Sequence, residues 1–238
     1  MSKIYNMKLV AFVLILSSQL YGDYKITTET TARSVDAEQA KGFELRGNIN
    51  AVGELLKARR FEEADRTLSD LRARFEHQFD PKLKQFTFQS KEEYDDYRTT
   101  NSQSIERVDW GYKQCLQFQA FLCSERKEFD EALKLLSHIE TLAPVSSDTA
   151  CETGYILNQL GKYEEGLAAY TRAYDLSVRY ASQKSAAPVA LRGMGYSLGE
   201  LRRFDEAERR YRKSLELEPG NRIALGEIQY LHDQNKKK

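Results

Sequence analysis

The stretch GKYEEGLAAYTRAYDLS at residues 161–177 decides the fold, because near copies of it occur elsewhere in the chain. A later copy reads RRFDEAERRYRKSLELEP at residues 202–219, and an earlier one reads KEFDEALKLLSHIETLAP at residues 127–144. Near its start, each copy has an aromatic residue, then two acids, then a glycine or alanine. Self-similarity of this kind predicts a protein built from repeated structural units.

The spacing of the copies indicates the size of the unit. Phe129 and Tyr163 mark one step of the repeat, and Phe61 lies two such steps before Phe129. The step from Tyr163 to Phe204 is longer by seven, and the excess falls near the small, polar stretch ASQKSAA at residues 181–187. A constant period of about 34 residues, which the regular steps have, is typical of arrays in which each unit is a pair of helices.

Each unit reads as two helices joined by a tight turn. In the copy that begins at residue 147, the first helix covers DTACETGYILNQL, Gly161 and Lys162 form the turn, and the second helix follows. Acids at the start of the second helix complement its dipole, and Pro144 and Pro219 end two of the second helices. The small residues that would let the paired helices approach are Ala64, Ala132, Gly166 and Ala207 on the second helices and Ala120, Gly154 and Gly195 on the first.

These features together resemble the tetratricopeptide repeat family. The resemblance implies an all-α fold, a right-handed superhelical array of antiparallel helix pairs. It covers three units, at residues 113–146, 147–180 and 188–221, and we expect residues 222–238 to form a capping helix with a basic tail. Residues 41–112 form a divergent N-terminal helical region.

The divergent region contains one weak copy and one stretch that departs from the pattern. The copy at residues 45–78 has Val52 where a small residue is expected and Glu76 where the proline is expected. In residues 79–112, Asp95 and Arg98 stand at the positions of the turn aromatic and the small residue. This stretch is therefore either a decayed repeat or an insertion, and we expect it to hold turns and a short helix around SKEEYDDYR.

Residues 1–22 have the pattern of a secretory signal peptide. Lys3 and Lys8 precede a short apolar run, LVAFVLIL, and no acid occurs before residue 23. The run is short for a membrane-spanning helix. We expect export, to a bacterial periplasm, with an uncleaved inner-membrane anchor through residues 9–20 as the alternative. Residues 23–40 are polar and predict a flexible lead-in, with helix starting near Ser34 or Asp36.

Composition and motifs favour binding over catalysis. The formal net charge is zero, which gives no electrostatic basis for binding nucleic acid. The histidines, His77, His138 and His232, lie far apart and have no partner at metal-ligand spacing, so we expect no metal site and no cofactor. No phosphate-binding glycine loop or nucleophile motif occurs, and we expect no enzymatic activity. The three cysteines are an odd number, and we interpret them as buried thiols in helix packing.

The resemblance places a binding groove along the first helix of each unit. Eight residues before each turn aromatic stand Phe121, Tyr155 and Tyr196, and Tyr230 continues the row in the closing helix. Such a row either faces a ligand or fills space between units, and both interpretations stay open. The candidate partner-binding residues are Phe121, Tyr155, Asn158, Gln159, Arg192, Tyr196, Glu200 and Tyr230.

The family resemblance also implies a class of partner, which is another protein or a peptide. Some members hold the C-terminal carboxylate of chaperones with lysines, arginines and asparagines. Arg192 and Asn158 are present here, but the accompanying lysines are absent from the first helices, which speaks against that mode. The predicted function is an exported, non-catalytic binding scaffold with possible weak envelope association. A periplasmic immunity protein, an envelope-assembly factor and, as a remote alternative, an enzyme remain open, as does the oligomeric state.

Overall fold

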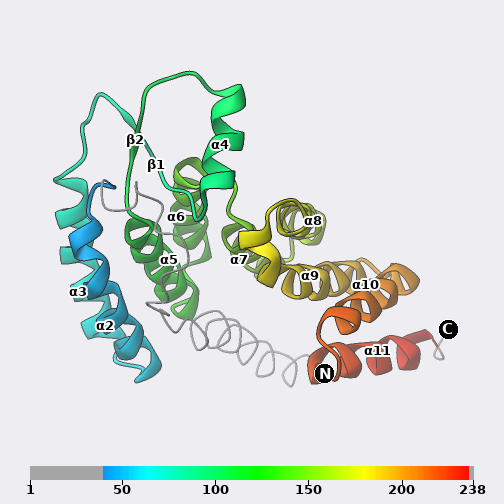
Figure 1. The fold of residues 1–238 in the computed structure, drawn as a ribbon. Coiled ribbons are helices and arrows are strands. Elements are labelled where there is room, and N and C mark those ends of the chain that lie inside the picture. The colour runs from blue at the N-terminus through cyan, green and yellow to red at the C-terminus, as the bar shows by residue number, and fades with distance from the viewer. Residues whose placement is uncertain (1–39, 236–238) are drawn as a thin grey trace.

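The computed structural model describes residues 40–235, which are built mainly from consecutive helix pairs (Figure 1). The predicted signal peptide, the lead-in up to residue 39 and the last three residues of the basic tail lie outside the described residues. The helices are α2 (Arg46–Lys57), α3 (Phe61–Glu76), α4 (Lys91–Thr100), α5 (Trp110–Glu125), α6 (Phe129–Leu142), α7 (Ser147–Gln159), α8 (Tyr163–Arg179), α9 (Ala187–Glu200), α10 (Phe204–Leu217) and α11 (Arg222–Asn235).

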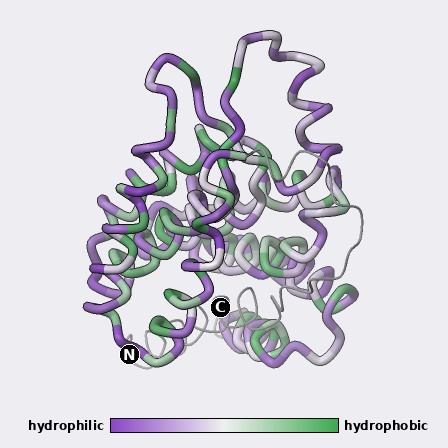
Figure 2. Tube along the Cα trace, turned by 60° about the vertical axis from the view of Figure 1, so that its left-hand side comes forward, coloured by the Kyte–Doolittle hydropathy of each residue, from purple (hydrophilic) through white to green (hydrophobic). Residues whose placement is uncertain are grey.

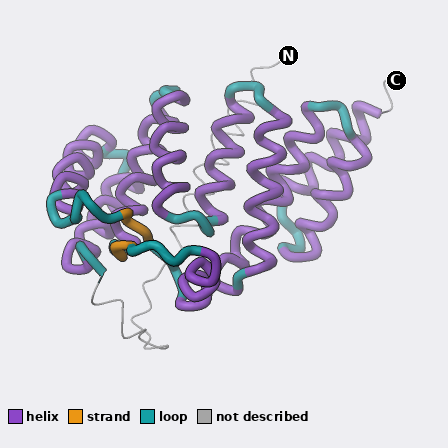
Figure 3. Tube along the Cα trace, turned by 90° about the horizontal axis from the view of Figure 1, so that it is seen from above, coloured by secondary structure: helices purple, strands orange, loops and turns teal. Residues whose placement is uncertain are grey.

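Neighbouring helices pack side by side in the order of the sequence, which confirms the predicted all-α solenoid (Figure 3). The pairs are α2 with α3, α5 with α6, α7 with α8, and α9 with α10, and α11 packs on α10 at the end of the array. Hydrophobic and hydrophilic residues alternate along the helices, so that each helix has an apolar side to bury (Figure 2). The excess of seven residues before α9 accommodates a short 3-10 helix, η3 (Ala181–Ala186).

The four turns within the pairs have one geometry. In each, the residue before the turn aromatic donates its backbone N–H to the carbonyl five residues earlier, with N···O distances of 2.8–2.9 Å. The residue before that donor has a positive φ, of 57° at Arg59, 62° at Lys127, 73° at Gly161 and 60° at Arg202. This is a Schellman-type helix ending. The first turn, in the most divergent copy, is therefore built like the others.

Small residues set the distance between paired helices, as the repeat pattern predicts. Ala64, Ala132 and Ala207 are fully buried. A Cβ added at Gly154 would lie 2.8 Å from the Tyr170 ring, and one added at Gly195 would lie 2.8 Å from the Tyr211 ring. A glycine on the first helix thus faces a tyrosine on a second helix, and the large ring fills the space that the missing side chain leaves.

The apolar core consists of three clusters that follow one another along the array. The first joins the α2–α3 and α5–α6 pairs, the second lies between α7, α8 and α9, and the third joins α9, α10 and α11. Cys115 and Cys151 are buried in the first two, and none of the three cysteines forms a disulfide. Burial raises the pKa of the Cys115 thiol to about 12, so it acts as a small apolar residue in the core.

Residues 79–109 form an insertion between α3 and α5 rather than a decayed repeat. It contains α4 and two short parallel strands, β1 (Lys84–Phe86) and β2 (Ile105–Arg107). The strands were not predicted, because three residues are too few to show an alternating pattern. Four aromatic rings, Phe86, Phe88, Tyr94 and Tyr97, pack together beneath α4.

Hydrogen bonds and ion pairs attach the insertion to the array. The backbone N–H of Thr87 donates to the Leu142 carbonyl at the end of α6, at 2.9 Å. On α4, the Asp96 carboxylate forms an ion pair with Arg179 at 2.7 Å, at the end of α8. The insertion therefore contacts both the α5–α6 pair and the α7–α8 pair, and it adds a second connection between these two neighbouring pairs. Within residues 40–235, no helix combines the length and apolar character that crossing a membrane requires.

Candidate functional site

Four of the eight predicted partner-binding residues come together in one pocket. Tyr155 and Asn158 of α7 and Arg192 and Tyr196 of α9 line it. They meet because α7 and α9 are the first helices of successive units and contact one another across the array. The pocket has an empty volume of about 390 Å³, which includes its open mouth, and α11 closes it on the far side with Ile223 and Glu227.

Tyr155 and Tyr196 are half-buried and line the pocket. Burial raises the pKa of Tyr155 to about 12, and the Glu125 carboxylate acts in the same direction. Burial also raises the pKa of Tyr196, and the Glu200 and Glu227 carboxylates raise this pKa further. Both hydroxyls therefore stay protonated at neutral pH and can donate hydrogen bonds to a ligand.

Asn158 and Arg192 are both buried, although the sequence predicts that they lie on a surface that contacts a partner. Asn158 accepts a hydrogen bond from the Ser197 hydroxyl at 3.0 Å and lies where a Cβ on Gly166 would meet it at 2.4 Å. The Arg192 side chain is 3% exposed and forms an ion pair with Glu218 at the end of α10. Both residues serve the packing of neighbouring units while they line the pocket.

The other four predicted residues lie around the pocket rather than in it. Phe121 is half-buried against the first core cluster, and its ring meets Phe61 edge to face with centroids 6.2 Å apart. Glu200 accepts a hydrogen bond from Tyr163 and, after burial, is the main cause of the raised pKa of that phenol. Gln159 and Tyr230 are partly exposed. Of the four rings, Phe121 packs against the first core cluster, whereas Tyr155 and Tyr196 line the pocket.

Sequence reasoning missed the floor of the pocket. Tyr170 of α8 and Tyr211 of α10 each have 2% of their surface exposed, yet both line the pocket from the second helices. Their rings reach it because Gly193 and Gly195 on α9 have no side chain in the way. A signal was available, because both tyrosines lie seven residues after a turn aromatic and face glycines of the first helices.

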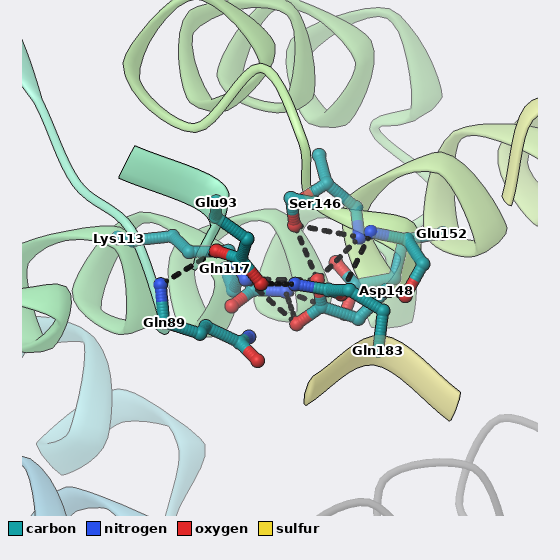
Figure 4. A network of polar contacts seen from close by, with 10 residues as sticks. Gln89, Glu93, Lys113, Gln117, Ser146, Asp148, Glu152 and Gln183 are labelled. Carbon is teal, nitrogen blue, oxygen red and sulfur yellow. Dashed lines mark hydrogen bonds and ion pairs between the residues drawn. The ribbon is translucent and has the colours of Figure 1, made fainter. Parts of the chain in front are cut away.

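A buried polar network lies along the same first helices, next to the insertion (Figure 4). The Lys113 ammonium of α5 contacts both carboxylate oxygens of Asp148 at 2.7 and 2.8 Å. Gln117 donates to Asp148 at 3.1 Å and to Glu152 at 3.2 Å. On the insertion side, Gln183 of η3 accepts from the Ser147 hydroxyl at 2.7 Å and donates to Glu93 of α4 at 2.7 Å.

The two carboxylates of α7 in this network have opposite pKa shifts. Asp148 has its pKa lowered to about 2, because the attraction and hydrogen bonds of Lys113, with those of Ser146 and Gln117, outweigh the opposing effect of burial. Glu152, one helical turn further on, has its pKa raised to about 8, by burial first and then by repulsion from Asp148. At neutral pH the α7 pair therefore consists of a charged Asp148 carboxylate and a protonated Glu152 carboxyl.

Among residues 40–235 no cluster of three or more histidine, cysteine, aspartate or glutamate side chains has a geometry suited to a metal ion. The Asp148–Glu152 pair has the split pKa values of some acid–base pairs. However, Lys113 binds the Asp148 carboxylate and Gln117 donates to the Glu152 carboxyl. These contacts connect α5 with α7.

Part of the array is similar in sequence to a known family. Residues 147–218 match the family model described as tetratricopeptide repeat. Among solved structures, the first TPR of Spaghetti (RPAP3), bound to the HSP90 peptide SRMEEVD, is similar with a TM-score of 0.46 and 20% sequence identity. The similar region covers 51% of this chain and 90% of that chain. No match was found among curated protein sequences.

Fold and site together define a class of protein. The described residues form an all-α solenoid of consecutive helix pairs, and α7, α8, α9 and α10 lie within the stretch that matches the tetratricopeptide repeat model. Its inner helices present a pocket lined by tyrosines, one arginine and one glutamate.

Proposed function

We propose that this protein is a non-catalytic scaffold that holds a segment of another protein against the inner faces of α7, α9 and α11. The observation that carries the proposal is the pocket formed by Tyr155, Tyr196 and Arg192, where successive first helices meet. Tyrosine and arginine are enriched among residues that dominate binding energy, because they offer large contact area and fixed hydrogen-bonding groups.

The test is capture of partners from an envelope extract by the purified chain. The double variant Tyr155→Ala/Tyr196→Ala should weaken binding of the main captured protein by about 2 kcal/mol or more, if the two rings act as the binding centre. Circular dichroism must show that the variant keeps its helical content. Unchanged affinity in a folded variant would rule out this pocket as the binding site.

A matched control separates loss of the pocket from loss of any exposed tyrosine. Tyr174 lies on α8, where the Lys213 ammonium covers its ring at 4.8 Å, and it does not line the pocket. We expect Tyr174→Ala to leave partner affinity unchanged. A loss as large as that of the double variant would place the partner on the outer helices instead.

We further propose that the protein is exported, on the basis of residues 1–22. Expression of the chain with and without this segment, followed by cell fractionation, tests this. The full chain should reach the periplasm in a shortened form, as mass spectrometry of its N-terminus would show. A full-length product in the cytosol would contradict export, and a full-length product in the inner membrane would support the anchor.

A further inference from the structure

The pocket on α9 contains three hydrogen-bonding groups that no other described residue satisfies. The Nε atom of Arg192 is buried and has no hydrogen-bond partner. Tyr170 and Tyr211, whose hydroxyls form no hydrogen bond with another residue among 40–235, line the same pocket. Buried polar groups are paired in more than about nine cases in ten. The buried and unpaired Nε of Arg192, in a pocket that two tyrosine hydroxyls also line, therefore points to a ligand that pairs with these groups.

Gly193 keeps these groups accessible. A Cβ at this position would come within 2.2–2.4 Å of the Tyr170 ring and within 2.3 Å of the carbon that carries its hydroxyl. The phenol end of Tyr170 therefore lies directly against the backbone of α9. A side chain at residue 193 would overlap the Tyr170 ring and displace it from the pocket.

The charges around the pocket select the chemistry of that ligand. Arg192 and Glu227 both line it and have opposite charges. Glu227 also raises the pKa of Tyr211, after burial, so its carboxylate acts on the space at that ring. A carboxylate ligand would face Glu227, and an ammonium ligand would face Arg192. A neutral group that both donates and accepts hydrogen bonds is repelled neither by the acid nor by Arg192.

We propose that the partner segment inserts a glutamine or asparagine side chain into this pocket. The amide oxygen has two lone pairs and accepts from Arg192 Nε and from one tyrosine hydroxyl. The amide NH2 has two donors and serves the Glu227 carboxylate and the oxygen of the other tyrosine. One amide thus satisfies all three unpaired groups. This inference rests on the proposed function, because it names the chemistry that the groove selects.

The experiment selects random dodecapeptides, displayed on beads, against the full chain. Selected peptides should share a glutamine or asparagine at one position. In synthetic versions of the tightest peptide, replacing this residue by leucine, glutamate or lysine should weaken binding at least tenfold, as measured by fluorescence anisotropy. A peptide preference for glutamate, lysine or an apolar residue at the shared position would overturn the inference.

Variants that remove only the hydroxyls connect the preference to the pocket. Tyr170→Phe/Tyr211→Phe keeps both rings, and it breaks no hydrogen bond within the described residues, so the melting temperature should not fall. This variant should bind the glutamine and leucine peptides with similar affinity, whereas the control Tyr174→Phe should keep the preference. A preference that survives the loss of both hydroxyls would overturn the inference.

The same experiment distinguishes failure of the inference from failure of the proposed function. Peptides that bind through another residue type, and that the Tyr155→Ala/Tyr196→Ala variant no longer binds, would leave the groove as the binding site and reject the amide. Peptides that the wild-type chain selects no better than that variant would reject both the amide and the groove.

Discussion

Pairs of one glycine and one tyrosine determine how closely the helices of this protein pack. Gly154 and Gly193 approach the Tyr170 ring from α7 and α9, and Gly195 approaches the Tyr211 ring. The two tyrosines are almost completely buried, so their rings have no room to move aside. The same pairs create the pocket, because the absent side chains leave the phenol ends of the rings accessible from the groove.

Alanine substitutions at two helical glycines should therefore have opposite effects on stability. Gly193→Ala places a Cβ 2.2 Å from Tyr170 and should lower the free energy of unfolding by about 1–3 kcal/mol through overpacking. Gly226→Ala in α11 meets nothing within 4 Å and should raise it by about 0.5–1 kcal/mol, because alanine is the better helix former. Urea denaturation followed by circular dichroism measures both. Equal effects at the two positions would contradict the close packing at Gly193.

At the scale of elements, the polar network holds α5, α7, η3 and α4 together. Lys113 has a side chain that is only 5% exposed, and Asp148 is its ion-pair partner. Removal of one member of a buried pair leaves the other charge without compensation in a poorly solvated place. The pair should therefore contribute far more to stability than the exposed ion pairs on the helix surfaces.

Neutralising Asp148 tests this difference. Asp148→Asn should lower the free energy of unfolding at pH 7 by about 3–5 kcal/mol, because it leaves the Lys113 ammonium buried and unpaired. The control is Glu131→Gln, which removes an exposed pair with Lys134, whose side chain is 73% exposed, and should cost less than about 0.5 kcal/mol. Thermal unfolding of both variants measures the difference. A small effect at Asp148 would show that the network does not connect the helices.

Glu152 should make stability depend on pH. Its pKa in the folded protein is about 8, compared with an ordinary value of 4.5, so the folded state binds a proton that the unfolded state has lost between these values. The resulting stabilisation is complete below pH 4.5 and disappears as the pH rises through 8. The groups that face Glu152 are Asp148, Lys113 and Gln117.

The measurement compares the wild-type chain with Glu152→Gln in urea at several pH values from 5 to 9. The difference in unfolding free energy should shift in favour of the glutamine variant as the pH rises, by an amount on the order of 3 kcal/mol. The comparison cancels contributions from other titrating groups such as His138, whose pKa burial lowers. A difference that stays constant with pH would contradict the raised pKa of Glu152.

The repeat pattern predicts the helix pairs well, because each turn is specified by residues close in sequence. It also predicts that Tyr155 and Tyr196 lie near one another, since equivalent positions of stacked units align. It does not predict that Glu93 bonds to Gln183, 90 residues away, because that contact depends on how the insertion folds back onto the array. Nor does it show that Arg192 pairs with Glu218, since the two residues lie in different helices of one unit.

At the scale of the whole molecule, consecutive helix pairs form an array, and the insertion contacts this array at the end of α6, at the end of α8 and at η3. The network reaches from α4 through η3 to the start of α7, while the pocket lies further along the same helices and is closed by α11 (Figures 1 and 4). A partner segment lying along the groove can therefore contact Tyr155, Tyr196 and the floor of the pocket together.

Hydroxyl-radical footprinting of the tyrosines, with and without the tightest dodecapeptide from the library, tests this central claim most directly. We predict that Tyr155 and Tyr196 become protected from oxidation when the peptide binds, while Tyr94 on the insertion and Tyr174 on α8 react as before. Protection of Tyr94 or Tyr174 with no change at Tyr155 and Tyr196 would contradict the account, because the partner would then lie outside the groove.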